Sequence, residues 1–218
     1  MAKAKAVVFD MDGTILDTLG DLVASVNYAL AQHGFPTHTA KEIRSYLGNG
    51  PANLIMQSCP AGTAKETVAA VLATYLPYYA VHSRDTTGPY AGVAEMLSQL
   101  KAAGVAMAVV SNKQECDVEA LRQVYFADTV SLAVGGSEGR PLKPDPTGVF
   151  IALERLGVAK EDAWFVGDSE VDVVTAKNAG MRCVAVSWGF RDAPDLQAAG
   201  AEIIVDTPQD VVKYILGE

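Results

Sequence analysis

The sequence predicts an α/β fold with a Rossmann-like parallel-sheet core and an inserted all-helical cap subdomain. Short apolar runs alternate with helical patterns, which is typical of parallel strands joined by crossover helices. One stretch of roughly 65 residues near the N-terminus breaks this alternation and contains only helical patterns. The length of 218 residues suits one large domain or a domain with a subdomain.

The first element is a strand over Ala6–Asp10, where Ala6-Val7-Val8-Phe9 is apolar at every position. A continuously apolar run is typical of a strand that is covered on both faces of a sheet. The two residues Asp10 and Asp12 come where this strand ends, and Gly13 opens a turn.

The next segment, residues 18–83, is the predicted helical cap, and residues 1–17 with 84–218 are the predicted core. Apolar residues recur at helical spacing from Leu19 to Leu30, and Gly34-Phe35-Pro36 ends that helix. We find no convincing strand between Leu19 and Val81.

After the cap, a helix is predicted from Val93, Met96, Leu97 and Leu100, which recur at i, i+3, i+4 and i+7. Gly104 is expected to end it, because glycine is common just past the last helical residue. Further apolar runs predict the other strands. They are Val105–Ser111, Thr129–Val134, Ala163–Gly167, Arg182–Ser187 and Glu202–Val205.

The charge balance limits the partners of the protein. It has 26 acidic and 17 basic residues, a net charge of −9. This argues against nucleic acid or an anionic membrane surface as the main partner. An anionic substrate would therefore have to meet a local positive pocket.

Cysteine usage and hydropathy indicate a cytoplasmic location. The three cysteines, Cys59, Cys116 and Cys183, are widely spaced and include no Cys-x-x-Cys pair. This pattern predicts free thiols in a reducing compartment and no zinc site. No apolar run approaches the ~18 residues of a membrane span, and the N-terminal run is too short for a signal peptide.

Asp10 and Asp12 are the strongest functional signal. In an open α/β sheet, ligands bind outside the carboxyl ends of the strands, so both acids are expected at the site. Unpaired carboxylates after a buried strand are costly, which argues for a functional role. The alternative is that Asp12 serves only in a turn or as a helix N-cap.

A second acidic pair, Asp168 and Asp172, follows the strand Ala163–Gly167. Carboxylates that converge from two strand ends would repel one another unless a cation neutralised them. Oxygen ligands of this kind favour Mg²⁺. The alternative is N-capping of the following helix by Asp168 or Ser169, and for Ser169 it suits well.

Two further segments could bind phosphate. Ser111-Asn112-Lys113 places a hydroxyl and backbone amides at a strand-to-helix junction, which suits phosphate. Lys143 lies in the loop Leu142-Lys143-Pro144-Asp145-Pro146. Taken singly, Ser111 could be an ordinary N-cap and Lys143 a solvated charge. Together with the two acidic pairs, they predict a phosphate site.

At these residues the sequence resembles the haloacid dehalogenase superfamily of phosphotransferases. Asp10-Met11-Asp12-Gly13-Thr14 looks like its first motif, Ser111 its second, Lys143 its third and Gly167–Asp172 its fourth. The resemblance covers essentially the whole chain, cap included. Within the superfamily the chain is most similar to bacterial phosphoglycolate phosphatases, although they more often carry Thr where Ser111 stands.

This resemblance implies a Mg²⁺-dependent phosphomonoester hydrolase acting through an aspartyl-phosphate. It implies Asp10 as the nucleophile and Asp12 as the general acid and base. Small phosphorylated metabolites, such as 2-phosphoglycolate, are the expected substrates. The other implied roles are metal binding by Asp10, Asp168 and the main-chain carbonyl of Asp12, and phosphate binding by Ser111, Asn112, Lys143, Gly13 and Thr14.

The resemblance also implies supporting and selective residues. Thr14 is expected to orient Asp12, and Ser169 and Asp172 are expected beside the metal ligands, with Asp172 holding either a metal-bound water or Lys143. In the cap, Arg44 and Asn49 are the candidates for reading the organic part of the substrate, and a solvated helix charge is the alternative for Arg44.

Other functions stay open from the sequence. A pyrophosphatase, a nucleotidase or a sugar-phosphate mutase would use the same chemistry. A receiver-type signalling module also has an acid cluster, a hydroxyl residue and a lysine, but the cap and the acid two residues after Asp10 argue against it. A catalytically silent relative is disfavoured by the intact acids. Both a monomer and a homodimer are compatible with the sequence.

Overall fold

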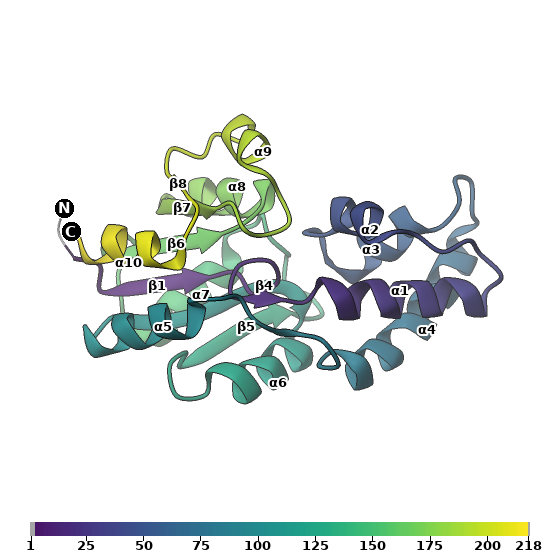
Figure 1. Cartoon of the computed structure of the whole chain (residues 1–218), viewed down its shortest axis with the longest axis horizontal. Coiled ribbons are helices and arrows are strands. Elements are labelled where there is room, and N and C mark those ends of the chain that lie inside the picture. Colours follow the sequence, from purple (N-terminus) through teal and green to yellow (C-terminus); the bar gives the residue numbers. More distant parts are fainter. Residues whose placement is uncertain (1–2, 218) are drawn as a thin grey trace. The chain divides into compact units, whose positions relative to one another are not determined.

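The computed structural model describes residues 3–217. The chain divides into two compact units, which are coloured along the sequence in Figure 1. The α/β unit comprises the chain up to Leu16 and from Pro89 onward, and the helical unit is Asp17–Gly88. The helical unit starts at Asp17 rather than at residue 18 and extends to Gly88 rather than to residue 83, where we placed the end of the cap.

A six-stranded sheet forms the centre of the α/β unit, with the strand order β5-β4-β1-β6-β7-β8. Every neighbouring pair is parallel, so the predicted parallel sheet is confirmed. The strands are β1 (Ala6–Phe9), β4 (Ala106–Gln114), β5 (Leu132–Gly136), β6 (Ala163–Gly167), β7 (Arg182–Val186) and β8 (Ile204–Val205). Because β1 lies between β4 and β6, the carboxyl ends of these three strands are neighbours.

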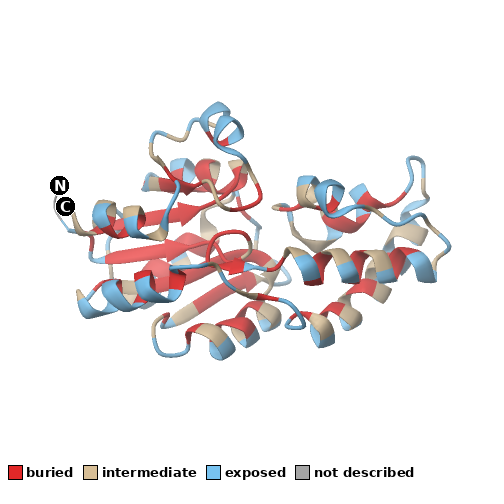
Figure 2. Ribbon diagram, viewed as in Figure 1, coloured by how far each residue is buried: buried red, intermediate tan, exposed pale blue. Residues whose placement is uncertain are grey.

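Helices cover both faces of the sheet, which explains why its strands are apolar throughout. Val7 and Phe9 of β1 pack into the core on one face, and Ala6 and Val8 pack into the core on the other. Figure 2 shows β1 as buried along its length. The first face is covered by α5 (Val93–Ala102), α6 (Glu115–Phe126) and α10 (Pro208–Leu216), and the second by α7 (Thr147–Leu156) and α8 (Glu170–Ala179).

Helix α5 follows its sequence pattern closely. The four residues Val93, Met96, Leu97 and Leu100 are its buried stripe. The helix ends at Ala102, and Gly104 follows with a φ of 76°, a left-handed conformation that glycine adopts without steric cost. The predicted helix and its termination are confirmed.

Several strand boundaries differ from the prediction: β8 begins at Ile204 rather than at Glu202, β1 and β7 each end one residue earlier than expected, and the largest differences are in β5 and β4. Residues 129–131 are not in β5, because Thr129 and Val130 donate their amide N–H groups to the carbonyl of Phe126 and so close the end of α6. Strand β4 runs on to Gln114, past a register shift against β5 between Val110 and Gln114. The predicted strand had ended at Ser111.

The helical unit contains α1 (Leu19–Gln32), α2 (Ala40–Tyr46), α3 (Gly50–Ser58) and α4 (Lys65–His82). Its end is tied to its beginning by Asp21, which is only 2% exposed. The Asp21 carboxylate accepts hydrogen bonds from the amide N–H and the hydroxyl of both Thr86 and Thr87, at 2.6 to 2.9 Å. We call these four bonds the Asp21 clasp.

Two short strands lie where the chain passes between the units. β2 (Leu16–Asp17) and β3 (Gly88–Pro89) form a two-stranded sheet. Strands of two residues carry no periodicity, so the sequence did not predict them. Within residues 3–217, no helix combines the length and the apolar character that crossing a bilayer requires.

Candidate functional site

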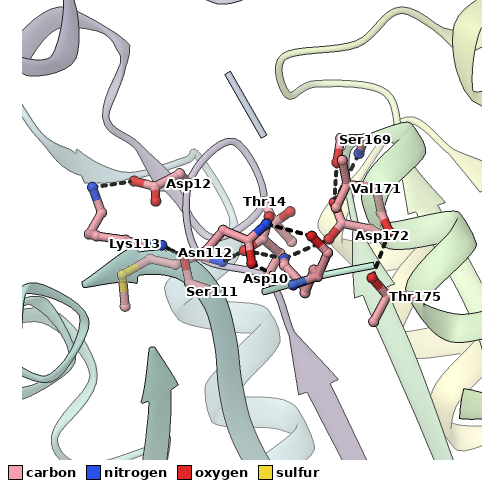
Figure 3. A network of polar contacts seen from close by, with 12 residues as sticks. Asp10, Asp12, Thr14, Ser111, Asn112, Lys113, Ser169, Val171, Asp172 and Thr175 are labelled. Atoms are coloured by element: carbon pink, nitrogen blue, oxygen red, sulfur yellow. Dashed lines mark hydrogen bonds and ion pairs between the residues drawn. The ribbon is translucent and has the colours of Figure 1, made fainter. Parts of the chain in front are cut away.

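Three adjacent strands deliver the candidate site residues to one edge of the sheet. Asp10 follows β1, Asp168 follows β6, and Ser111 lies near the end of β4. These strands are neighbours in the order β4-β1-β6, so the residues that follow them meet as the sequence predicts. Figure 3 shows Asp10 between Ser111 and Asn112 on one side and Asp172 on the other.

The structure brings three buried carboxylates together: Asp10, Asp168 and Asp172. One oxygen of each lies within 4.8 Å of the others, and the residues are 8%, 1% and 0% exposed. We call them the carboxylate cluster. The side chain of Asp12 is directed elsewhere, toward Lys113 (Figure 3).

Lys143 lies inside the carboxylate cluster. Its Nζ is 2.8 Å from Asp10 Oδ1 and 2.7 Å from Asp172 Oδ1, and its side chain is 3% exposed. Burial alone would lower the pKa of Lys143, but Asp10 and Asp172 outweigh burial and raise it. Lys143 therefore stays charged, and of the two roles open for Asp172, the structure has it holding Lys143.

Asn112 fixes the loop that carries Lys143. Its side-chain amide donates to the carbonyl of Lys143 at 2.9 Å, and its Oδ1 accepts the Lys143 amide N–H at 2.7 Å. This paired bond joins the end of β4 to the Lys143 loop. The side chain of Asn112 thus positions Lys143. The predicted phosphate role of Asn112 therefore concerns its backbone amide.

Asp168 is held by two donors, one on each oxygen. Thr14 Oγ1 donates to Asp168 Oδ1 at 2.8 Å, and the Phe190 amide N–H donates to Oδ2 at 2.7 Å. From the sequence we expect Thr14 to orient Asp12, whereas the structure shows its hydroxyl donating to Asp168. The amide of Phe190 was missed, although the segment Trp188–Arg191 directly follows the strand end of β7 and so was in place to reach the site.

Two glycines allow this close packing around Asp168. A Cβ atom on Gly13 would lie 2.4 Å from Asp168 Oδ2, and one on Gly189 would lie 2.3 Å from Asp168 Cβ. Gly13 also has a φ of 84°, in the left-handed region. A side chain at either position would therefore displace Asp168.

Asp172 and Ser169 form the start of α8. Asp172 Oδ2 accepts the Ser169 hydroxyl at 2.7 Å and the Ser169 amide N–H at 3.0 Å. Ser169 is the N-cap residue of α8 and Asp172 is the N3 residue of the capping box, so the N-cap alternative for Ser169 is the observed one. Asp172, which belongs to the carboxylate cluster, is therefore also part of this cap. Ser169 holds Asp172 in place while the other Asp172 oxygen contacts Lys143.

The electrostatics of the carboxylate cluster are those of a cation site. Burial, and then repulsion by Asp172, raises the pKa of Asp168 to about 7. The same two causes raise the pKa of Asp10 well above its ordinary value, against the opposing effect of Lys143. Three carboxylates face the Lys143 ammonium, so part of their charge stays uncompensated. Buried carboxylate oxygens of this kind suit Mg²⁺, and the donor set fits a divalent cation.

Ser111 and the two cap candidates complete the predicted set. Ser111 is 5% exposed, and its Oγ accepts the Lys113 amide N–H at 3.2 Å, which leaves the hydroxyl hydrogen available to a ligand. In the helical unit, Arg44 lies half-buried in the last turn of α2, and Asn49 is exposed directly before α3. Their roles stay predictions.

Known proteins resemble this chain along most of its length. A family model described as haloacid dehalogenase-like hydrolase matches residues 7–186. Phosphoglycolate phosphatase 1 of Pseudomonas aeruginosa is 33% identical over 214 residues, which cover 95% of this chain and 78% of that protein. The N-acetylmuramic acid 6-phosphate phosphatase of the same organism is 30% identical, over 98% of this chain and 95% of that protein.

Solved structures give the same picture. A crystal structure of a candidate phosphoglycolate phosphatase from Lactobacillus delbrueckii subsp. bulgaricus matches with a TM-score of 0.95 and 36% identity. The match covers 99% of this chain and 100% of that one.

Proposed function

Since the chain belongs to the haloacid dehalogenase-like hydrolases, we propose that it hydrolyses small phosphate monoesters, with 2-phosphoglycolate as the first candidate substrate. The observation that carries the proposal is the buried cluster of Asp10, Asp168 and Asp172 around Lys143. The cluster would provide a nucleophile and a cation site, with carboxylate oxygens within 4.8 Å of one another, and Lys143 would provide a fixed positive charge 2.8 Å from Asp10.

In the first step, a carboxylate oxygen of Asp10 attacks phosphorus while the bond to the ester oxygen breaks. Asp10 Oδ1 is held by the Met11 amide N–H at 2.7 Å and by Lys143, so its position is fixed before the substrate arrives. Asp12 gives its proton to the leaving alkoxide oxygen. The products of this step are the free alcohol and an aspartyl-phosphate on Asp10.

In the second step, water attacks the phosphorus of the aspartyl-phosphate. Asp12, now a carboxylate, takes a proton from this water, and the phosphorus bond to Asp10 breaks. Inorganic phosphate leaves, and Asp10 and Asp12 return to their starting states. One residue thus serves as acid and then as base.

Phosphate binding and charge balance fall to groups around Asp10. Ser111 and Lys143 would bind phosphoryl oxygens, with the backbone amides near Gly13, Thr14 and Asn112. Asp10, Asp168 and the main-chain carbonyl of Asp12 would hold Mg²⁺. When bound, the cation neutralises charge between an anionic nucleophile and an anionic substrate.

The choice of substrate rests on the named relatives. Phosphoglycolate and N-acetylmuramic acid 6-phosphate are both phosphate esters that carry a carboxylate. We therefore propose a carboxylate-bearing substrate, with the helical unit as the cap and Arg44 and Asn49 as its readers. The second relative favours a sugar acid phosphate as the alternative substrate. A cytoplasmic location is part of the same proposal, because the thiols Cys59, Cys116 and Cys183 are unpaired.

A phosphate-release assay tests the proposal. With Mg²⁺, kcat/KM is measured for phosphoglycolate, N-acetylmuramic acid 6-phosphate, glucose 6-phosphate, a nucleoside monophosphate and pyrophosphate. We expect the two carboxylate-bearing esters to give the highest values, and Asp10→Asn to lose nearly all activity. Hydrolysis that survives in Asp10→Asn above a few per cent would reject Asp10 as the nucleophile, and a preference for pyrophosphate would reject the substrate class.

A further inference from the structure

Lys113 has no part in the steps described above, although it lies beside one of their central residues. Its Nζ is 3.0 Å from Asp12 Oδ1, and the two side chains are 8% and 18% exposed (Figure 3). Surface ion pairs between flexible side chains contribute little to stability. This pair is largely removed from water, so its charges interact more strongly, and loss of one partner would leave the other poorly compensated.

The backbone of Lys113 is fixed by the sheet. The register of β4 against β5 shifts between Val110 and Gln114, so residues 111–113 bulge out of the ladder. Bulges of this kind redirect side chains next to active sites. The Lys113 amide N–H also donates to Ser111 Oγ at 3.2 Å, which links Lys113 to the predicted phosphate-binding hydroxyl.

Close approach of β5 holds this bulge in place. A Cβ atom on Gly135 would lie 2.4 Å from Glu115 Cα and 2.9 Å from the carbonyl oxygen of Lys113. The neighbouring glycine, Gly136, pairs with Gln114 in the shifted register. The direction of the Lys113 side chain is thus built into two strands.

A second carboxylate, that of Asp117 in the first turn of α6, also interacts electrostatically with the same ammonium. Burial raises the pKa of Asp117 above its ordinary value; Lys113 and a hydrogen bond from Cys116 oppose this increase, and Asp12 adds to it. Lys113 therefore attracts two acids, Asp12 near the end of β1 and Asp117 at the start of α6. Its charge holds together groups that would otherwise repel one another.

We propose that Lys113 is the positioning residue of Asp12. Its ammonium holds the Asp12 carboxyl group near the end of β1 in both of its states. Lys113 forms an ion pair with Asp12 while Asp12 is ionised, and it donates a hydrogen bond to Asp12 while Asp12 carries the proton that the leaving oxygen of the substrate must receive. The inference rests on the proposed function, because it gives Lys113 its effect through the acid and base role of Asp12.

The test uses the whole protein and two leaving groups. Single-turnover cleavage of an alkyl phosphate requires a proton from Asp12, whereas the first release of p-nitrophenol from p-nitrophenyl phosphate does not. We expect Lys113→Met to slow alkyl phosphate cleavage by about 10²-fold, the lower end for loss of a general acid, and to leave the p-nitrophenol burst rate and the KM within a few-fold. Lys113→Arg should recover most of the rate.

Two controls make the outcome specific. Lys5→Met breaks an exposed Lys–Asp pair of the same unit, with Lys5 Nζ 2.8 Å from Asp162 Oδ2, and should change neither rate. In an Asp12→Asn background, Lys113→Met should add no further loss, because the group that it positions is already absent. The double variant removes both charges of the ion pair and so leaves neither one buried without its partner. It can therefore be measured in place of Lys113→Met if that single variant does not fold.

Several results would overturn the proposal. Equal losses on both leaving groups would make Lys113 a structural residue, and a raised KM with unchanged cleavage rate would make it a substrate ligand. Additive losses in the Asp12→Asn background would separate it from Asp12. A wild-type protein that releases no phosphate from any ester would reject the proposed function together with this inference, whereas an active wild type with an unaffected Lys113→Met rejects the inference alone.

Discussion

Asp12 is assigned two successive roles, and its substitution separates them. In Asp12→Asn, alkyl phosphate cleavage lacks its acid and should slow by about 10²–10⁴-fold. With p-nitrophenyl phosphate the first step needs little protonation, but hydrolysis of the aspartyl-phosphate lacks its base. We expect a burst of p-nitrophenol near one equivalent and phosphate trapped on Asp10, measured by stopped-flow absorbance and mass spectrometry. A protein with neither a burst nor labelled Asp10 would contradict the acid–base assignment.

A second prediction for a single residue concerns the Thr14 hydroxyl, which donates a hydrogen bond to Asp168. Thr14→Val removes the donor to Asp168 Oδ1 while keeping the side-chain shape. Residues that orient metal ligands typically contribute 10–100-fold to metal affinity, so we expect the Mg²⁺ concentration for half-maximal activity to rise by about that factor. The rate at saturating Mg²⁺ should change little.

Thr175→Val is the matched control for Thr14→Val. Thr175 is buried in α8, and its hydroxyl donates to the Val171 carbonyl, within the helix. It should leave the Mg²⁺ dependence unchanged. If both variants shift that dependence equally, the effect belongs to general packing and the assignment of Thr14 to Asp168 has no functional weight.

At the scale of single residues, the sequence predicts which side chains meet but not how they pair. Asp10, Asp168 and Ser111 are predicted because polar residues at the ends of buried apolar strands indicate a site, and Lys143 is predicted because it lies in an adjacent loop. The partner of Thr14 could not be found in this way, since Asp12 and Asp168 are both within plausible reach of a hydroxyl after Gly13. The choice depends on the turn geometry at Gly13 and on the close approach of Gly189 to Asp168, which no local sequence pattern encodes.

At the scale of secondary-structure elements, the Asp21 clasp joins the start of α1 to Thr86 and Thr87 at the end of the helical unit. Asp21→Asn keeps one carbonyl acceptor but places an NH₂ group against the donors of Thr87. Hydrogen bonds to a charged group contribute about 1.5–3 kcal/mol each, so we expect a loss of about 2–4 kcal/mol from the stability of the helical unit. Hydrogen exchange followed by mass spectrometry should show faster exchange in α1 and in residues 83–88.

The clasp also predicts a pH dependence of the helical unit. Burial raises the pKa of Asp21, but the hydrogen bonds from Thr86 and Thr87 outweigh it and lower the pKa below its ordinary value. The stabilisation from the Asp21 clasp is therefore present above about pH 4 and is lost as the pH falls through the depressed pKa of Asp21.

The control for Asp21→Asn is Glu66→Gln, an exposed change in the first turn of α4, which should leave hydrogen exchange unaltered. Equal rates of hydrogen exchange in Asp21→Asn and Glu66→Gln would contradict the role of the Asp21 clasp.

Elements were predicted best where a pattern repeats over several residues. The stripe Val93–Leu100 and the apolar run of β1 repeat long enough to identify α5 and a doubly covered strand. β5 was misplaced because Thr129 and Val130 are as suited to a strand as its true residues, and their amides are taken by Phe126 at the end of α6. The bulge in β4 depends on glycines of another strand, so no local pattern predicts it.

At the scale of the whole molecule, we expect the carboxylate cluster to couple folding stability to pH and to the proposed Mg²⁺. The pKa of Asp168 is raised to about 7, and that of Asp10 is also raised, so without a cation the folded state binds protons more tightly than the unfolded state. The stabilisation from protonating Asp168 is complete below about pH 4 and is lost as the pH rises through about 7, and Asp10 acts in the same direction. A bound cation favours the ionised carboxylates and should reverse this loss.

We therefore expect Mg²⁺ to stabilise the α/β unit more at pH 8 than at pH 5.5, because protons compete with the metal for the same oxygens. A Mg²⁺ concentration of 100 Kd contributes about 2.7 kcal/mol, which corresponds to a Tm increase of about 5–10 °C for a protein of this size. Tryptophan fluorescence reports this unit alone, since Trp164 and Trp188, the two tryptophans of the chain, both belong to it. Asp168→Asn should remove most of the Mg²⁺ effect. An equal shift at both pH values, or the same shift from NaCl at matched ionic strength, would mean that Mg²⁺ acts through general screening and not through the carboxylate cluster.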